Sequence, residues 1–286
     1  MVRTIGLVLK PAALEALEAL GVVRALVPAG RLLVEDNGHL AIDTLPAGVE
    51  LVSGSVLERE AELVIVLGGD GTLIHAASLL REKVIPILGV NLGHVGFLTD
   101  CARDELPAVL PKALANALPH LDRMRLDVSV RRDGSEMVAR RILNDVTVTP
   151  PGRARLAHYR ITHGGELVTT LRADGVIVAT PTGSTAYSLA AGGSILSPGL
   201  HAILITPVCP HSLTQRPIVV DPTREVSITL ESGLPVCVAM DGGTCVELAP
   251  GDVVSVRVAP VRTRLLAVPW RGYFQTLRAK LGWGDG

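Results

Sequence analysis

One segment, residues 62–90, constrains the fold of this chain more than any other. Glu62–Leu67 is an apolar run after its first residue, and Gly68–Gly71 interrupts it. Thr72–Leu80 then has apolar residues at helical spacing, and Val84–Val90 is apolar again. Two apolar strands connected through a helix form a βαβ unit, in which the strands are parallel and covered on both faces. The segment therefore predicts an α/β domain with a parallel sheet.

The sequence on either side extends the same domain. Thr4–Leu9 predicts a strand, and Ala12–Leu20 predicts a helix that stops at Gly21. A further helix is predicted over Asp104–Leu118, bent or restarted at its prolines. Because hydrophobic residues make up 48% and aromatic residues only 2% of the chain, the core must consist of Val, Leu, Ile and Ala. We expect an α/β nucleotide-binding domain over residues 1–120.

The hydrophobic period changes near residue 121. From there, apolar residues alternate with polar ones in short segments, separated by turn signals such as Asp133-Gly134 and Gly164-Gly165. Val226–Leu230 and Val236–Met240 flank Ser232-Gly233 in the same manner. Short alternating strands at regular spacing predict an all-β, antiparallel sandwich domain over residues 121–262.

The last segment, residues 263–286, has a helical pattern over Arg271–Trp283, and we expect this C-terminal helix to pack back on the first domain. Glycine-rich motifs lie on both sides of the boundary near residue 120. Ligand sites favour domain interfaces and the carboxyl ends of parallel strands. We therefore expect both domains to contribute to one ligand site.

Charge and hydropathy exclude several classes of partner. With 27 basic and 28 acidic residues, the net charge of −1 gives no electrostatic footprint for nucleic acid or an anionic membrane. No apolar run reaches the roughly 18 residues of a membrane span, and Ile5–Leu9 is too short for a signal-peptide core. The four cysteines have no metal-ligand spacing and suggest no disulfide framework. We expect a cytoplasmic protein in a reducing environment.

Gly68-Gly69-Asp70-Gly71-Thr72 is the sharpest local motif. Its glycines permit a tight turn with an accessible backbone, and free N–H groups at the start of the following helix suit phosphate oxygens. Asp70 at the apex can then meet a hydroxyl group. The alternative is that Asp70 only caps the helix, but a cap does not require glycines on both sides. The motif is neither a Walker A loop nor a GxGxxG fingerprint.

This pentapeptide resembles the signature of a kinase superfamily that includes NAD kinases, diacylglycerol and sphingosine kinases, and phosphofructokinase-type enzymes. The stretch from Asp174 to Gly193 is similar to the NAD kinase family in particular. In it, an apolar strand leads into small hydroxylated residues that can bind ribose and phosphate oxygens, while Tyr187 offers a flat face for a base. The chain is thus identified as a member of the NAD kinase (ATP-NAD kinase) family, of bacterial type.

Three further segments resemble the same family. Asn91–Leu98 resembles its second glycine-rich loop, although such a loop also simply connects a strand to a helix. Leu143–Val146 matches an Asn-Glu pair of the family, with Asp145 in place of Glu. His211–Pro217 resembles a segment near the site, in which His211 is equally consistent with a structural histidine. The family often has arginine where Ser78 stands in this chain.

The resemblance implies a role for each matching residue. Asp70 would accept the proton of the attacking hydroxyl group, Phe97 would form a wall of an adenine pocket, and Arg155 and Arg172 would reach dinucleotide phosphates. His75 lies one helical turn after Asp70 and would contact a phosphate. The complete set of expected binding residues is Gly71, His75, Phe97, Asn144, Asp145, Arg155, Arg172, Asp174, Thr185, Ala186, Tyr187, Ser188, Leu189 and Ala190.

The implied reaction transfers a phosphoryl group from ATP, or another donor such as polyphosphate, to the adenosine-ribose 2′-hydroxyl of NAD. No carboxylate cluster with metal-ligand spacing is present, so Mg²⁺ is expected to arrive with ATP. The resemblance implies a homodimer or homotetramer. A lipid kinase with the same pentapeptide is an alternative against which residues 174–193 argue. A non-catalytic dinucleotide sensor is another, and the intact Asp70 argues against it.

Overall fold

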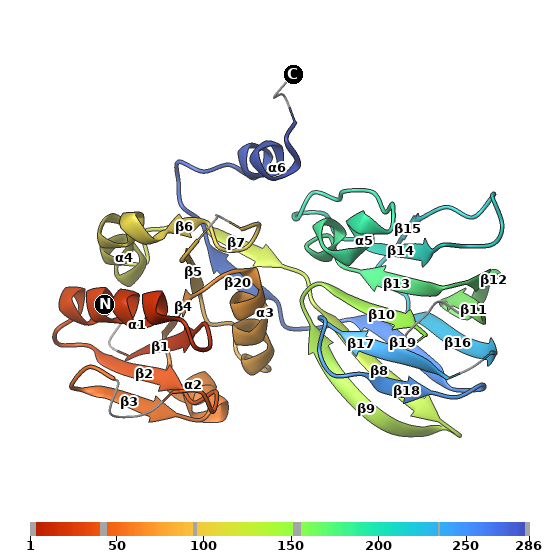
Figure 1. Ribbon diagram of the computed structural model, residues 1–286, viewed down its shortest axis with the longest axis horizontal. Helices are drawn as coiled ribbons and strands as arrows, with labels where there is room; N and C mark the ends of the chain where they lie inside the picture. The colour runs from red at the N-terminus through yellow and green to blue at the C-terminus, as the bar shows by residue number, and fades with distance from the viewer. Residues whose placement is uncertain (1–3, 41–44, 94–95, 151–155, 234, 284–286) are drawn as a thin grey trace. The chain divides into compact units, whose positions relative to one another are not determined.

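The computed structural model describes residues 4–40, 45–93, 96–150, 156–233 and 235–283. These residues form two compact units, each with its own core (Figure 1). The first unit comprises residues 4–122 together with 263–283, and the second comprises residues 123–262. The chain therefore leaves the first unit once and re-enters it near its C-terminus.

The first unit is built on a sheet with strand order β3-β2-β1-β4-β5-β20-β7, in which β6 also pairs with β5. The printed pairs from β3 across to β20 are all parallel. The order reverses direction between β1 and β4, so the carboxyl ends of these two strands form a topological switch point. The strands are β1 (Thr4–Leu9), β2 (Arg31–Glu35), β3 (Val49–Val52), β4 (Leu63–Leu67), β5 (Ile87–Asn91), β6 (Cys101–Ala102), β7 (His120–Arg123) and β20 (Thr263–Leu266).

Helices cover both faces of this sheet (Figure 1). The buried sides of α1 (Leu14–Leu26) and α4 (Leu106–Leu114) share one apolar cluster with β1, β2, β4 and β5. On the other face lie α2 (Gly54–Glu60) and α3 (Asp70–Leu79), which contact β1 and each other. A short 3₁₀ turn, η2 (Arg103–Glu105), precedes α4, and α6 (Tyr273–Leu281) ends the unit.

The chain segment that leads into α6 is anchored within the first unit. Trp270 Nε1 donates a hydrogen bond to Glu105 Oε1 at 2.8 Å, and Arg271 Nη2 donates to the same oxygen at 3.0 Å. The Lys112 ammonium group of α4 lies 5.2 Å from the centre of the Trp270 ring. The expected C-terminal helix is confirmed and the segment before it returns to the first unit, while the insertion of β20 into the sheet was not predicted.

The predicted parallel α/β domain is confirmed, but several helix boundaries differ from the prediction; the helix expected over Asp104–Leu118, for example, spans Leu106–Leu114. The first helix does not stop at Gly21 but continues to Leu26, because the completely buried Val23 extends the apolar side formed by Ala16 and Leu20. This burial offsets the roughly 1 kcal/mol cost of a glycine inside a helix. The helix predicted to start at Thr72 starts at Asp70.

The second unit consists of two antiparallel sheets, with strand orders β15-β14-β13-β10-β17-β18 and β12-β11-β16-β19-β8-β9. Their inner faces share one core cluster, which confirms the predicted sandwich. The strands of the first sheet are β10 (Asp145–Thr149), β13 (Gly175–Ala179), β14 (Ile203–Val208), β15 (Ile218–Val220), β17 (Val236–Met240) and β18 (Val246–Leu248). Those of the second are β8 (Leu126–Arg132), β9 (Ser135–Ile142), β11 (Ala157–His163), β12 (Glu166–Ala173), β16 (Val226–Ser232) and β19 (Val253–Val258).

Two of the predicted hairpins are confirmed. Asp133-Gly134 joins β8 to β9, Gly164-Gly165 joins β11 to β12, and all four residues have positive φ, as primed turns require. The third prediction is wrong, because β16 pairs with β11 and β19 whereas β17 pairs with β10 and β18. Both strands bury alternate residues, so the sequence pattern did not specify their partners, and Ser232-Gly233 lies on a connection between sheets.

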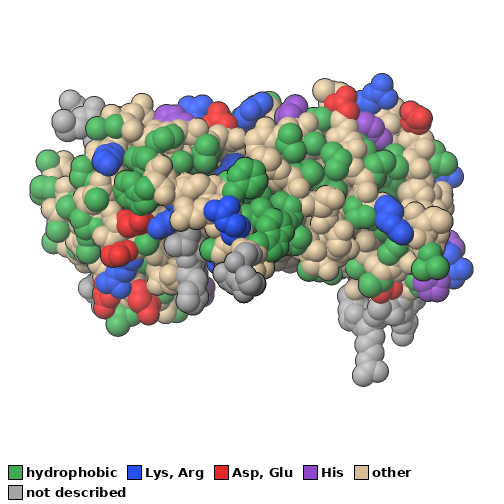
Figure 2. Space-filling model, turned by 90° about the horizontal axis from the view of Figure 1, so that it is seen from above, with side chains coloured by type: hydrophobic (Ala, Val, Ile, Leu, Met, Phe, Trp, Pro, Cys, Tyr) green, Lys and Arg blue, Asp and Glu red, His purple; other side chains and the backbone are tan. Residues whose placement is uncertain are grey.

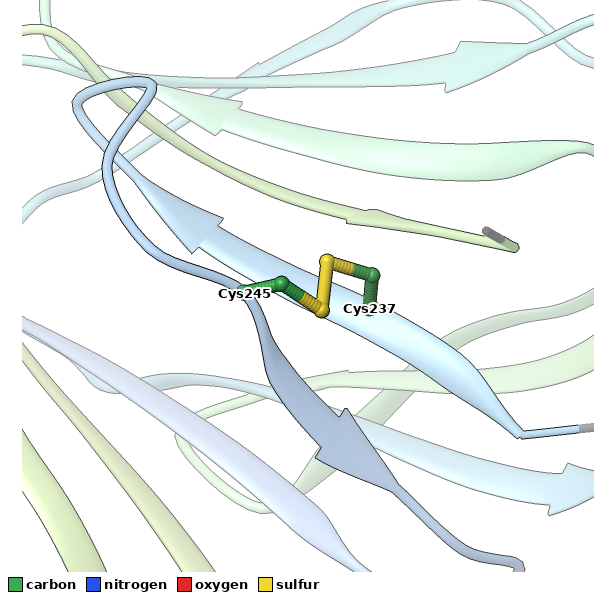
Figure 3. Close-up of a disulfide and its surroundings, with 2 residues drawn as sticks. All are labelled: Cys237 and Cys245. Atoms are coloured by element: carbon green, nitrogen blue, oxygen red, sulfur yellow. A yellow bond between two sulfur atoms is a disulfide. The ribbon is translucent and has the colours of Figure 1, made fainter. Parts of the chain in front are cut away.

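Cys237 and Cys245 form a disulfide (Figure 3). Antiparallel pairing of β17 with β18 places Val238 opposite Val246, which brings the two cysteine Cα atoms to 5.4 Å. The expectation that the cysteines form no disulfide is therefore wrong for this pair, because the hairpin register and not the sequence spacing decides which thiols meet. Cys101 is buried and Cys209 is exposed, and both are free thiols.

Two further observations concern membrane-spanning helices and the distribution of surface charge. In the part of the chain that the structure describes, no helix combines the length and apolarity needed to cross a bilayer. Basic and acidic side chains are interspersed over the face shown in Figure 2.

Candidate active site

Asp70 is the first residue of α3, just beyond the carboxyl end of β4. The N-cap is Gly69 and the cap has no side-chain hydrogen bond, so Asp70 does not serve as the helix cap. Instead its Oδ2 accepts a hydrogen bond from the Phe97 amide at 2.8 Å. Its Oδ1 accepts from the Leu98 and Thr99 amides at 3.1 Å and from the Thr99 hydroxyl at 3.0 Å. The carboxylate thus holds the second glycine-rich loop against the start of α3.

Buried polar side chains complete this attachment. Asn91 Nδ2 donates to Thr99 Oγ1 at 2.8 Å, and Asn91 Oδ1 accepts from the Gly93 amide at 2.7 Å. A Cβ atom on Gly96 would lie 2.0 Å from Asp70 Oδ1, so the carboxylate reaches the loop only because residue 96 has no side chain. Phe97 is half-buried. His94 and Val95, from the same predicted loop, lie outside the described residues.

The first turn of α3 is open on its outer side. Gly71 is exposed, and a Cβ atom added to Gly71 or to Gly69 would meet no atom within 4 Å. The N–H groups of a first helical turn have no partner within the helix, and the helix dipole places partial positive charge there. The arrangement suits the oxygen atoms of a phosphate group.

His75 lies one turn further along α3, and its Nε2 is 2.9 Å from Glu35 Oε1. Glu35 ends β2 and is only 5% exposed, whereas about half of the His75 side chain is exposed. The hydrogen bond that His75 donates to the Glu35 carboxylate raises the pKa of His75, although partial burial opposes the shift. The sequence predicted His75 but missed Glu35, for which the only local signal is an acid at the end of the apolar run Leu32–Val34.

In the second unit, Asp241 fixes the segment that contains Asn144 and Asp145. Asp241 Oδ2 accepts from the Leu143 amide at 2.7 Å, and Oδ1 accepts from the amides of Asn144 at 2.7 Å and Asp145 at 3.2 Å. Asp241 adopts a positive φ of 50°. The sequence did not single out Asp241, although Gly242-Gly243 beside it resembles the glycines around Asp70.

The hydroxylated segment after β13 joins the same cluster. Thr180 Oγ1 donates to the Leu143 carbonyl at 2.7 Å, and the Thr180 amide donates to the Asn144 carbonyl at 2.9 Å. A Cβ atom on Gly183 would lie 2.2 Å from that Asn144 oxygen. The structure therefore brings together residues 143–145, the turn that follows β13, and Asp241.

Asp145 is a buried acid beside a second acid. It is 4% exposed, and burial raises its pKa to about 7, with the charge of Asp241 adding to the shift. A hydrogen bond from the backbone of Tyr187 acts in the opposite direction. Burial also raises the pKa of Asp241, against the effect of the three amides that it accepts. Near neutral pH, Asp145 can therefore either donate or accept a hydrogen bond.

The remaining predicted residues from this segment follow in η3 (Gly183–Thr185) and α5 (Tyr187–Ala190). Tyr187 is 47% exposed, and Ala190 is also exposed. Thr185, Ala186 and Leu189 are half-buried. Ser188 is completely buried, and its hydroxyl is 2.8 Å from Thr206 Oγ1, so this side chain packs inside the unit.

Arg172, Asp174 and Arg155 complete the predicted set. Arg172 is exposed on β12, in the other sheet of the sandwich from Asp145. The carbonyl of Arg172 accepts a hydrogen bond from the His211 amide at 2.9 Å. Asp174 is half-buried between β12 and β13; burial raises the pKa of the Tyr159 hydroxyl, and the charge of Asp174 adds to the shift. Arg155 lies outside the described residues.

Within the described ranges, which omit residues 94–95 and 151–155 among others, no group of three or more His, Cys, Asp and Glu side chains is arranged to hold a metal ion.

The chain has a Gly-Gly-Asp-Gly turn at the switch point of a parallel sheet, and it also folds into an antiparallel sandwich. Together these features define a kinase of the class that phosphorylates a hydroxyl group. Residues 50–118 match the ATP-NAD kinase N-terminal domain, and residues 143–268 match the ATP-NAD kinase C-terminal domain. The chain belongs to the NAD kinase family.

Individual relatives agree with this assignment. An NAD kinase of Geobacter sulfurreducens is 48% identical over 226 residues, which cover 79% of this chain and 80% of that protein. An NAD kinase of Syntrophotalea carbinolica is 45% identical over 225 residues, covering 78% and 79%. Yeast NADH kinase, solved with NADH, has a TM-score of 0.91 and 26% identity over 100% of this chain and 89% of its own. An Archaeoglobus fulgidus NAD kinase, solved with ATP, shares the fold with a TM-score of 0.76, 23% identity and 98% coverage of both chains.

Proposed function

We propose that this protein transfers the terminal phosphoryl group of ATP to the adenosine-ribose 2′-hydroxyl of NAD, which yields NADP and ADP. The observation that carries the proposal is the Asp70 carboxylate, held beside the open first turn of α3 in a member of the NAD kinase family. Phosphoryl transfer requires a site for the donor phosphate and a nearby group that accepts the proton of the attacking hydroxyl, and one turn of helix offers both here.

Asp70 retains capacity for a substrate hydroxyl. Each carboxylate oxygen accepts about two hydrogen bonds. Oδ1 already accepts three, whereas Oδ2 accepts only that of the Phe97 amide. We therefore assign Oδ2 as the acceptor of the 2′-hydroxyl proton. The ribose oxygen then forms a bond to the terminal phosphorus, the bond to the ADP oxygen breaks, and the amides of the α3 first turn stabilise the transferred charge.

The dinucleotide is assigned mainly to the second unit. Asn144 Oδ1 is buried and, among the described residues, has no hydrogen-bond partner, so it can accept from a ribose hydroxyl. Asp145 supplies a second group for the same sugar, and the exposed ring of Tyr187 offers a face for a base. We likewise assign Phe97 to an adenine wall, Asp174 and the stretch Thr185–Ala190, apart from the buried Ser188 side chain, to dinucleotide contacts, and Arg155 and Arg172 to its phosphates.

Mg²⁺ would arrive bound to the ATP substrate and would supply positive charge that neutralises the transferred group. The domains are a nucleotide-binding domain over residues 1–120, an NAD-binding domain over 121–262, and a returning segment over 263–286. We also propose a cytoplasmic homodimer or homotetramer, and polyphosphate as a further donor to be tested.

The test uses the wild-type protein with ATP labelled at its terminal phosphate, Mg²⁺, and equal concentrations of NAD and diacylglycerol vesicles. The proposal expects the label in the 2′-phosphate of NADP. Label in phosphatidic acid would instead identify a lipid kinase. Binding of NAD without any transfer of label would identify a dinucleotide sensor, and either result would overturn the proposal.

A further inference from the structure

The disulfide between Cys237 and Cys245 encloses the turn that carries Asp241. Cys237 lies in β17 and Cys245 directly precedes β18, with a sequence separation of 8 (Figure 3). The turn between them contains Asp241, whose carboxylate accepts hydrogen bonds from the amides of residues 143–145. One covalent bond therefore joins the two arms of the hairpin beside the anchor of the segment to which the NAD ribose is assigned.

The disulfide lies on the outer side of its sheet. Val236 and Val238 of β17 are buried in the sandwich core, so Cys237, which lies between them, faces away from that core. Cys237 is half-buried and Cys245 is exposed. Small thiols and disulfides in solution can therefore reach the Cys245 sulfur, and breaking the disulfide leaves no cavity in the core.

The turn has a conformation that benefits from a cross-link. Asp241 has a φ of 50°, which is costly for a residue with a side chain, and Gly242 and Gly243 beside it are exposed. The second arm, β18 (Val246–Leu248), is an edge strand of three residues. A cross-link across the base of the turn lowers the entropy of its open conformations and so favours the closed one.

The turn is also connected to residues 143–145 through the backbone. The Asp241 amide donates a hydrogen bond to the Asp145 carbonyl at 2.9 Å, and next to it Met240 of β17 pairs with Val146 of β10. Opening of the turn would thus release both the carboxylate and the amide of Asp241 from this segment. The state of the disulfide can in this way reach the proposed NAD site.

We infer that Cys237 and Cys245 form a redox switch for NAD binding. The disulfide holds Asp241 in position, whereas the dithiol form lets its turn open and binds NAD more weakly. The inference rests on the proposed function and adds regulation to it. In a reducing cytosol the dithiol form would prevail, and disulfides that form there are usually transient and redox-sensing.

Oxidation proceeds by exchange with a low-molecular-weight disulfide such as glutathione disulfide. The Cys245 thiolate attacks one sulfur of the reagent, whose S–S bond breaks and releases one thiol. The Cys237 thiolate then attacks the Cys245 sulfur, which forms the protein disulfide and releases the second thiol. The protein loses two electrons and two protons, and the reagent takes up both to become two thiol molecules.

The test measures NAD binding by calorimetric titration without ATP, in the disulfide form and after reduction with dithiothreitol. Reduction of the wild-type protein should raise the Kd for NAD roughly threefold to tenfold, the effect of losing about one hydrogen bond. The double variant Cys237→Ser, Cys245→Ser should bind NAD as weakly as the reduced protein and should not respond to dithiothreitol. Cys209→Ser, which removes the exposed free thiol, is the matched control and should respond as wild type does.

Two further measurements distinguish a switch from a disulfide that only stabilises the fold. In Asp241→Asn, reduction should change the Kd for NAD by less than about twofold, because the disulfide acts through this carboxylate. Saturating NAD should also raise the ratio of disulfide to dithiol protein in a fixed glutathione buffer, by the same factor as the change in Kd, because the coupling is reciprocal.

Equal Kd values for NAD in the disulfide and dithiol forms of the wild-type protein would contradict the inference. So would an undiminished effect of reduction in Asp241→Asn. The two forms of the wild-type chain decide the question even if the double serine variant is unstable. Because NAD binding is measured without ATP and NADP formation is measured separately, failure of this inference is distinct from failure of the proposed function.

Discussion

Asp70 in the first unit and Asp241 in the second unit make the same kind of hydrogen-bonded contact, although the two units have unrelated folds. Each carboxylate accepts backbone N–H groups from a segment far away in sequence, Phe97–Thr99 for Asp70 and Leu143–Asp145 for Asp241. At Asp70 the close approach requires Gly96, because a Cβ atom there would lie 2.0 Å from Asp70 Oδ1. A carboxylate with several oriented acceptor sites fixes a loop more firmly than one backbone hydrogen bond can.

The surroundings of the two carboxylates differ. Asp70 adjoins an open first turn of helix, and one of its oxygens can still accept a hydrogen bond. Asp241 instead adjoins the buried Asp145, whose pKa is raised to about 7. Under the proposed function, the first unit would use its anchoring carboxylate in chemistry, while the second unit would use its anchor to present neighbouring groups.

Substitution of one glycine in each unit should produce the largest difference between the units in stability and turnover. Gly183→Ala places a Cβ atom 2.2 Å from the Asn144 carbonyl, a backbone atom, whereas Gly96→Ala places one 2.0 Å from the Asp70 carboxylate, which can rotate away. We expect Gly183→Ala to lower the free energy of unfolding by about 3 kcal/mol or more, and Gly96→Ala by less, while turnover falls sharply in Gly96→Ala. Urea denaturation and steady-state rates measure both, and the reverse order of stabilities would contradict the comparison.

The acid pair of the second unit should make stability depend on pH. Asp145 has a raised pKa of about 7 in the folded state against an ordinary value of 3.8 in the unfolded chain, so between those values only the folded state holds the proton. Rising pH therefore lowers stability, by about 1.4 kcal/mol per unit, until pH passes about 7. Asp145→Asn, which resembles the protonated acid, should gain roughly 2–3 kcal/mol of stability relative to wild type between pH 5 and pH 8. Equal pH dependence in the two proteins would show that Asp145 is not the group responsible.

Asp241→Asn tests the second anchor directly. The amide NH₂ cannot accept a hydrogen bond, so at least one of the amides of residues 143–145 loses its partner, at a cost of about 1–3 kcal/mol. We expect a raised KM for NAD with an unchanged KM for ATP. Asp133→Asn is the control, because Asp133 also has positive φ but lies in an exposed turn. An unaltered KM for NAD in the Asp241 variant would contradict the idea that Asp241 positions residues 143–145 for NAD binding.

The smallest expected change in stability concerns the open turn of α3. Gly71→Ala adds a Cβ atom where nothing lies within 4 Å, and alanine favours a helix, so stability should rise or fall by less than about 1 kcal/mol. The added methyl group should nevertheless raise the KM for ATP, because it occupies the space assigned to a phosphate. An unchanged KM would place the donor elsewhere.

Local patterns in the sequence predicted the features of the fold and site that depend on residues close together in the chain. Apolar runs identified β1, β4 and β5, glycine turns identified two hairpins, and the Gly-Gly-Asp-Gly motif identified Asp70. What the sequence did not reveal depends on contacts between distant segments. Asp241 lies almost a hundred residues from the amides it binds, Glu35 lies forty residues from His75, and Cys237 meets Cys245 only through strand register. The partners of β16 and the insertion of β20 were missed for the same reason.

The central claim is that Asp70 Oδ2 accepts the proton of the NAD 2′-hydroxyl during phosphoryl transfer. The most direct measurement is the single-turnover rate of NADP formation with saturating NAD and MgATP, in Asp70→Asn and in Thr99→Val, which removes a hydroxyl bonded to Asp70 but leaves the carboxylate intact. The account predicts a rate roughly 10²–10⁴-fold lower for Asp70→Asn and within about tenfold of wild type for Thr99→Val. A near-normal rate in Asp70→Asn, or an equal loss in both variants, would reduce Asp70 to an anchor for its loop.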